Sequence, residues 1–151
     1  MENTLKLEKK VIIDAPVTQV WKALTTSSIV EKYFFGNAAI SDWNVGSSLI
    51  FKGDWEGEEY LGRGIILNRV PYKLFRFSYW SSLSGLENKS ENYLHVSYHL
   101  AEEEDGRTEL TTVIEKIPHE NLRNKMDKDL NKILKSMKRV METEIMEESY
   151  S

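Results

Sequence analysis

A thirty-residue stretch near the C-terminus, residues 119–148, constrains the fold more than any other part of the sequence. Pro118 precedes it and neither Gly nor Pro interrupts it, so one continuous helix is predicted. Its apolar residues recur at steps of three and four, which places them on one helical face. They are Leu122, Met126, Leu130, Ile133, Leu134, Met137, Val140, Met141 and Ile145. Such a helix spans about 40 Å and needs a large apolar partner, because helix propensity alone would not hold it.

The first third of the chain predicts one strand and two short helices. Apolar and charged residues alternate over residues 5–13, which is typical of a strand with one buried face. Residues 17–24 carry apolar side chains at helical spacing, so a short amphipathic helix follows. A second short helix is predicted at residues 27–33, where Ser28 and Glu31 match a capping box.

From residue 36 to the long helix, the pattern is all strand. Strands are predicted at residues 38–40, around Leu49 and Phe51, at 60–69, from Phe75 to Tyr79, at 92–101 and at 108–116. We expect residues 52–54 to end the second of these strands and Gly62 and Gly64 to bend or bulge the third. Asp105-Gly106 predicts a hairpin between the last two strands. The prediction is therefore an α+β fold, with a curved antiparallel sheet of six to seven strands wrapped on the long helix, in a single domain over residues 1–151.

Composition excludes several classes of function. The net charge is -4 and the pI about 5.5, which argues against nucleic acid as a partner, because phosphate contacts need clustered Lys and Arg. The chain has no Cys, so it has no disulfide and no thiolate chemistry. No apolar run reaches the length of a membrane span, and the first ten residues lack the core of a signal peptide, so a cytoplasmic protein is expected.

The order of elements and several local motifs together carry a family resemblance. The motifs are Ile13-Asp14-Ala15-Pro16, Val20-Trp21-Lys22-Ala23-Leu24-Thr25, Tyr33-Phe34-Phe35-Gly36, Ser41-Asp42-Trp43 with Val45-Gly46, and Gly64-Ile65-Ile66 leading to Pro71. With the last hairpin, they resemble the START-like superfamily, also called SRPBCC or Bet-v-1-like, which has the helix-grip fold. Within it, the chain looks like the branch named for the activator of the heat-shock-protein-90 ATPase. The resemblance covers nearly the whole chain and implies an apolar space between sheet and long helix.

The chain departs from this family's pattern at two places. Asp129-Leu130 stands where many relatives carry Gly-Trp, and that Trp would face the cavity. Ser47 stands where the family often has a second Gly. Members of the superfamily bind lipids and hydrophobic metabolites or act as cyclases, hydrolases or co-chaperones, and they share no universal catalytic residues. The fold therefore does not by itself name the function.

Residue types that could carry catalysis or a metal do not form a recognisable pattern. His95 and His99 are about 13 Å apart on one strand and face outward, too far apart to share a metal. Asp54, Glu58 and Glu59 could pair as acid and base, but a solvated turn is the favoured interpretation. No nucleophile elbow is present. We therefore assign no catalytic residue, no metal and no cofactor.

The candidate ligand-binding residues share apolar or aromatic side chains, with a few hydroxyls and flexible methionines among them. They are Tyr33, Phe34, Trp43, Phe51, Trp55, Phe77, Tyr79, Tyr98, Thr112, Met126, Leu130, Ile133 and Met137. Trp21, by contrast, is predicted to pack in the core.

Three functions stay open on the sequence. The favoured one is noncovalent binding of a hydrophobic small molecule, lipid-like or aromatic. The second is a co-chaperone-like partner that stimulates an ATPase, which a closed, dry cavity would favour. The third is an enzyme of the cyclase or hydrolase kind, which an open cavity with a buried carboxylate or histidine would favour.

Overall fold

The computed structural model describes residues 4–149, and side chains as far as residue 143, so Ile145 of the predicted apolar face lies outside the described side chains. The elements follow one another as β1 (Leu5–Ile13), α1 (Val17–Leu24), α2 (Ser27–Tyr33), β2 (Ala38–Ile40), β3 (Ser48–Trp55), β4 (Glu58–Val70), β5 (Leu74–Ser81), the 3-10 turn η1 (Ser90–Asn92), β6 (Leu94–Glu102), β7 (Thr108–Ile117) and α3 (Glu120–Ser149). The predicted order of strand, two short helices, further strands and long helix is confirmed.

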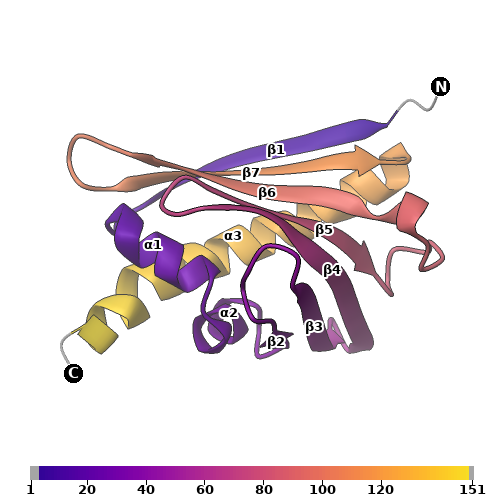
Figure 1. The fold of residues 1–151 in the computed structure, drawn as a ribbon, viewed down its shortest axis with the longest axis horizontal. Helices are drawn as coiled ribbons and strands as arrows, with labels where there is room; N and C mark the ends of the chain where they lie inside the picture. Colours follow the sequence, from indigo (N-terminus) through magenta and orange to yellow (C-terminus); the bar gives the residue numbers. More distant parts are fainter. Residues whose placement is uncertain (1–3, 150–151) are drawn as a thin grey trace.

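The seven strands form one antiparallel sheet in the order β1-β7-β6-β5-β4-β3-β2. The two short helices are inserted between β1 and β2, which lie at opposite edges of the sheet. Figure 1 shows the sheet curving around α3, which crosses it diagonally, with α1 and α2 beside the C-terminal half of that helix. No helix in the described part of the chain is long and apolar enough to cross a membrane.

The N-terminal end of α2 differs from the prediction. The helix begins at Ser27 as expected, but its N-cap residue is Thr26 and no side chain caps it, so the predicted Ser28–Glu31 capping box is wrong. The Thr26 hydroxyl instead donates a hydrogen bond to the Lys22 carbonyl, 2.6 Å away. The Glu31 carboxylate accepts one from the Ala39 N–H at 3.2 Å. Glu31 therefore ties α2 to β2.

The predicted end of β3 at residues 52–54 is also wrong, because β3 continues to Trp55 and pairs with β4 over that whole stretch. Gly53 is present for another reason. A Cβ atom at this position would clash with the side chain of buried Asn37. Asn37 in turn donates a hydrogen bond to the Phe34 carbonyl at 2.9 Å. The glycine therefore makes room for the segment that leads from α2 into the sheet.

The glycines of β4 mark close approaches between strands. A Cβ at Gly64 would clash with the Ser78 carbonyl of β5. The register shift between these strands falls further along, between Ile66 and Asn68. On the inner face, a Cβ at Gly62 would clash with the Tyr60 and Tyr79 side chains. Gly62 therefore provides space for two tyrosines of the site described below.

Trp21 packs in the core, as predicted, and is 5% exposed. Its ring lies edge-on to Phe75 at a centroid distance of 6.3 Å. The Arg69 guanidinium lies 5.6 Å from the ring centroid, at cation–π distance. Trp21 does not border the cavity, so its role is to join α1 to the sheet.

Candidate ligand-binding site

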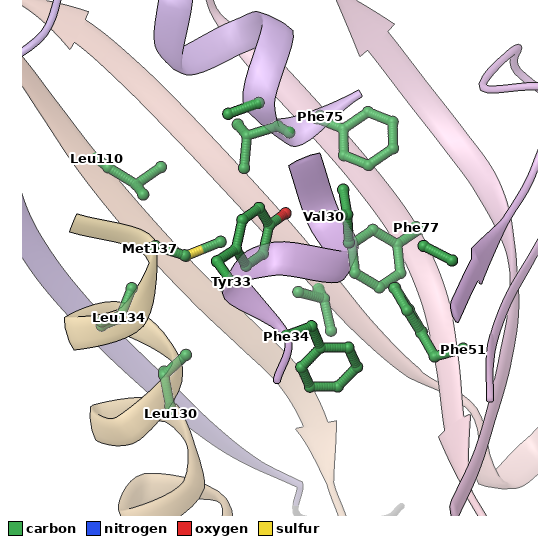
Figure 2. Packing of buried hydrophobic residues seen from close by; sticks show 14 of the residues in the cluster. Val30, Tyr33, Phe34, Phe51, Phe75, Phe77, Leu110, Leu130, Leu134 and Met137 are labelled. Carbon is green, nitrogen blue, oxygen red and sulfur yellow. The ribbon is translucent and has the colours of Figure 1, made fainter. Parts of the chain in front are cut away.

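A cavity of about 140 Å³ lies between the sheet and the N-terminal half of α3. Its walls come from α2, from the inner face of β3 to β7, from the loop after β5 and from α3. Figure 2 shows Phe51 and Phe77 on the sheet side of this interior, Phe34 at the end of α2 and Leu130 on the α3 side. Side chains that were predicted from opposite ends of the chain therefore face one another across one space.

All candidate ligand-binding residues except Met137 border the cavity: Tyr33, Phe34, Trp43, Phe51, Trp55, Phe77, Tyr79, Tyr98, Thr112, Met126, Leu130 and Ile133. Met137 is fully buried and lies further along α3, where Figure 2 shows it between Leu110 and Tyr33. The placement of Met137 on the cavity wall is therefore corrected, because the cavity ends before that turn of the helix. Whether the bordering residues hold a ligand stays a prediction.

The aromatic side chains of the wall contact one another in a continuous network. Phe34 lies edge-on to Phe51 and Tyr60, with centroid distances of 5.1 and 5.7 Å. Phe77 contacts Phe51 at 6.3 Å and Tyr98 at 6.0 Å. Rings packed in this way have few rotamers open to them, so the wall keeps its shape without a ligand.

Trp43 reaches the cavity from a turn rather than from a strand. Its backbone has a φ of 63°, in the left-handed region that few non-glycine residues adopt. Its indole N–H donates a hydrogen bond to the Ser27 hydroxyl at 3.0 Å, which fixes the ring against α2. The ring also lies 6.0 Å from that of Phe75.

Several bordering residues were missed by sequence reasoning. Tyr60 lies at the start of β4, and the period-two alternation from Ile66 back to Tyr60 was a usable signal. Leu83 and Leu86 come from the irregular loop after β5, where no periodicity points inward. Asp129 was noticed only as a departure from the family pattern, and it borders the cavity.

The cavity contains tyrosine hydroxyls in two different states. The Tyr60 and Tyr79 hydroxyls are hydrogen-bonded to each other, and burial raises the pKa of both. Burial also raises the pKa of Tyr33 and Tyr98, whose hydroxyls have no hydrogen-bond partner among the described residues. The buried Thr112 hydroxyl has no partner there either. An unpaired buried polar group costs about 1–3 kcal/mol, so the Thr112 hydroxyl needs an explanation.

The outer part of the cavity carries its only charged lining groups within the described chain, Lys125 and Asp129. Lys125 is exposed and donates a hydrogen bond to the Leu83 carbonyl at 2.8 Å. Burial raises the pKa of the half-buried Asp129 carboxyl, and Lys125 partly offsets this. The Trp55 indole N–H is buried next to this carboxyl and also lowers its pKa, although it forms no well-aligned hydrogen bond in the described structure. The charges mark the mouth of the cavity.

The histidines and the acidic turn that could carry catalysis or a metal lie away from the cavity. His95 lies 2.8 Å from Arg76, measured from its Nδ1 to an Arg76 Nη, while burial and then that guanidinium lower the pKa of the imidazole. Neither His95 nor the exposed His99 borders the cavity. Asp54, Glu58 and Glu59 are exposed and do not border it either. Within the described chain, no three His, Asp or Glu side chains lie close enough together to hold a metal ion.

A curved antiparallel sheet that encloses an aromatic cavity against one long helix defines a helix-grip protein of the SRPBCC, or Bet-v-1-like, class. The chain belongs to the family described as activator of Hsp90 ATPase homolog 1-like protein, which matches residues 14–142. That match includes α1, α2, all strands from β2 to β7 and most of α3.

Solved structures support the same fold. The solution structure of ChR145 from Cytophaga hutchinsonii is 30% identical to this chain and covers 97% of it and 99% of its own length, with a TM-score of 0.77. The Aha1 dimer from Colwellia psychrerythraea is 19% identical and covers 92% of this chain and 97% of its own, with a TM-score of 0.73. At that identity, the second likeness shows the fold alone.

One relative found by sequence is the type II restriction enzyme CviJI of Paramecium bursaria Chlorella virus IL3A, 29% identical over 127 residues. The match includes 82% of this chain but 34% of that enzyme. The chain therefore spans about a third of the length of this relative.

Proposed function

We propose that the protein binds a hydrophobic or aromatic small molecule in the cavity between the sheet and α3, without covalent chemistry. The observation that carries the proposal is the cavity itself, which is lined mainly by aromatic and aliphatic side chains, with hydroxyls among its few polar groups and Lys125 and Asp129 at its mouth. Such a protein would act in the cytoplasm, because a chain without Cys suits a reducing compartment.

The volume limits the size of the ligand. An engineered protein cavity of about 150 Å³ holds benzene. A cavity of about 140 Å³ therefore has room for one ring or a short chain. A larger ligand would have to extend past Lys125 and Asp129 at the mouth.

A fluorescence titration tests the proposal directly, because Trp43, Trp55 and Trp80 border the cavity. We expect nitrobenzene, a single-ring quencher of indole fluorescence, to quench Trp fluorescence with saturation at one site per chain. Thr112→Trp should abolish the quenching while the protein still unfolds cooperatively, because the added ring enters the cavity.

The matched control is Thr111→Trp, because Thr111 is the neighbour on β7 and does not border the cavity. This variant should keep wild-type quenching. No saturable quenching in the wild-type protein, together with destabilisation by Thr112→Trp of about 1–3 kcal/mol, would show a solid interior and reject the proposal. Native mass spectrometry of protein purified from its own host would reveal a carried ligand as added mass.

The family description favours a second candidate, an interaction protein that stimulates a chaperone ATPase. Large apolar side chains exposed on the surface supply possible contacts: Phe35, Ile40, Val45, Ile65, Val70 and Tyr72. The ATPase rate of a heat-shock-protein-90 chaperone, measured with and without this protein, tests it. A rate that rises with wild-type protein and equally with Thr112→Trp would favour this candidate over ligand binding.

An enzyme of the cyclase or hydrolase kind is the third candidate. It would rest on Asp129, the one carboxylate that borders the cavity among the described residues. A general acid or base needs a second group to position or complete the reaction, and no described histidine lies on the wall. Noncovalent binding needs no such group, so we place it first.

A further inference from the structure

Three hydroxyl-bearing side chains border the cavity where α2 faces β6 and β7: Tyr33 and Thr112 are buried, and Tyr98 is partly exposed. Tyr98 of β6 and Thr112 of β7 are directly opposite in the ladder between these strands, and both border the cavity. Directly opposite residues on one sheet face have Cβ atoms about 5 Å apart. Tyr33 borders the cavity from α2, and the Tyr98 phenol helps burial to raise its pKa.

None of these three hydroxyls has a hydrogen-bond partner among the described residues. The Thr112 side chain is 0% exposed and its hydroxyl has no partner, while Tyr33 is 4% exposed. Neither Tyr33 nor Tyr98 forms a hydroxyl hydrogen bond within the described structure. The contrast within the same wall is the Tyr60–Tyr79 pair, whose hydroxyls satisfy each other. The fold thus pairs the Tyr60 and Tyr79 hydroxyls with each other, and leaves Tyr33, Tyr98 and Thr112 on the cavity wall without a hydroxyl partner among the described residues.

The surroundings of the three hydroxyls decide which ligand atom suits them. The neighbouring wall is formed by neutral side chains, among them Phe77, Val96 and Ile114. The charged lining groups, Lys125 and Asp129, lie at the mouth. An ion among the hydroxyls would be buried without a counter-charge, which is strongly unfavourable. A neutral oxygen can accept hydrogen bonds from the phenols and donate to or accept from the threonine.

We propose that Tyr33, Tyr98 and Thr112 form a hydrogen-bonding subsite that selects a neutral, single-ring ligand carrying a hydroxyl or carbonyl oxygen. This inference rests on the proposed binding function and specifies its ligand class. The ring occupies the apolar part of the cavity, and its oxygen replaces the hydrogen bonds that the protein does not supply. The subsite discriminates against isosteric hydrocarbons, because these leave the three hydroxyls unpaired.

Phenol and toluene form the test pair, because they have nearly the same shape and differ in one hydroxyl against one methyl group. Isothermal titration calorimetry gives the ratio of the two dissociation constants for wild-type protein, Tyr98→Phe and Thr112→Val. Comparing this ratio between proteins cancels the different hydration of the two ligands. We expect each substitution to reduce the preference for phenol about fivefold to tenfold, the size of one neutral hydrogen bond.

The matched controls make the same substitutions at residues that do not border the cavity. Tyr72→Phe and Thr111→Val should leave the ratio unchanged, because neither residue borders the cavity. Tyr33→Phe gives a third independent reading if either primary variant does not fold. Benzoate tests the charge argument, since it should bind at least tenfold more weakly than phenol.

The outcomes separate the inference from the function on which it rests. If both ligands bind and the ratio of their dissociation constants in each variant stays within twofold of wild type, the subsite is wrong and the binding function stands. Binding of benzoate as tight as phenol also overturns it. Absence of binding by phenol and toluene alike overturns both proposals. A ratio that falls in the three cavity variants and in neither control supports the subsite.

Discussion

The two halves of α3 share one apolar face but border two different interiors. In the C-terminal half, Met137, Val140 and Met141 are fully buried. In the N-terminal half, Met126 and Ile133 keep partial exposure and border the cavity. A regular pattern along one helix therefore does not imply a uniform core.

The difference comes from what each half packs against. The C-terminal half is fastened to neighbouring elements: Ser136 donates a hydrogen bond to the Tyr33 carbonyl, and Lys138 donates one to the Ile12 carbonyl, both at 2.6 Å. There, α1 and α2 supply small and branched side chains such as Val20 and Ala23, which are 0% exposed. Such side chains interdigitate closely with those of a helix. The core is solid where the two inserted helices meet α3.

The N-terminal half faces large rings on the sheet. The Phe51 and Tyr79 rings meet edge-on and the Phe77 and Tyr98 rings are tilted against each other, so the wall holds its shape without filling the space in front of it. Polar links to α3 in this half lie at its outside, as with Arg123, which donates to the Lys6 carbonyl at 2.9 Å. The C-terminal half of α3 therefore contributes mainly to the stability of the fold, and the N-terminal half forms part of the site.

The largest expected effect comes from truncating one methionine in each half. Met137→Ala should destabilise the protein by about 2–5 kcal/mol, because it opens a cavity in a packed region. Met126→Ala should cost less than about 1 kcal/mol, because this side chain is already partly exposed and borders the cavity. Urea denaturation measures both free energies of unfolding. Equal losses would show that the two halves are equally packed and would break the comparison.

A smaller effect, with opposite signs in the two halves, is expected from adding one methyl group. Val20→Ile should cost about 1–3 kcal/mol, because Val20 is fully buried and does not border the cavity. Val96→Ile should be neutral or stabilise by up to about 0.8 kcal/mol, because its extra methyl group enters the cavity. Thermal unfolding of both variants checks the signs. A clear loss of stability in Val96→Ile would mean that the cavity facing the N-terminal half of α3 has no room for a methyl group.

The fold followed from sequence because its elements have local signals. Alternation over β1 and helical spacing over α1 and α3 each predicted the observed element within a few residues. The errors occurred where a distant residue decides the local outcome. Gly53 does not end β3, because the glycine is there to make room for the Asn37 side chain. Glu31 does not cap α2, because its carboxylate accepts a hydrogen bond from the Ala39 N–H instead.

The site was less accessible to sequence reasoning. Periodicity indicates which side chains point inward, so every candidate residue except Met137 borders the cavity. It does not indicate whether inward side chains from facing elements touch, which is why Met137 was placed on the wall. Residues from loops, such as Leu83, have no period to reveal them. The pairing of Tyr60 with Tyr79, which leaves Tyr98 unpaired, depends on three strands together.

The smallest expected effect concerns Asp129, the carboxylate at the mouth of the cavity. Burial raises its pKa above the ordinary value of 3.8. Between that value and the raised one, the folded state binds more protons than the unfolded state, so stability falls as the pH rises through this window. At neutral pH the loss is complete. The carboxylate is therefore mildly destabilising where the site would be occupied.

Asp129→Asn removes the titrating group and keeps the side chain's shape, so it should raise the melting temperature at pH 7. The gain should shrink as the pH falls and vanish below 3.8, where Asp129 is protonated in both states. Melting curves from pH 3 to pH 8 measure the difference. Asp127→Asn, which removes an ion pair with Lys9 outside the cavity, should give no such gain. A pH-independent difference for Asp129→Asn would show that this carboxyl is as well solvated as a surface group, so that it would not belong to the cavity that faces the N-terminal half of α3.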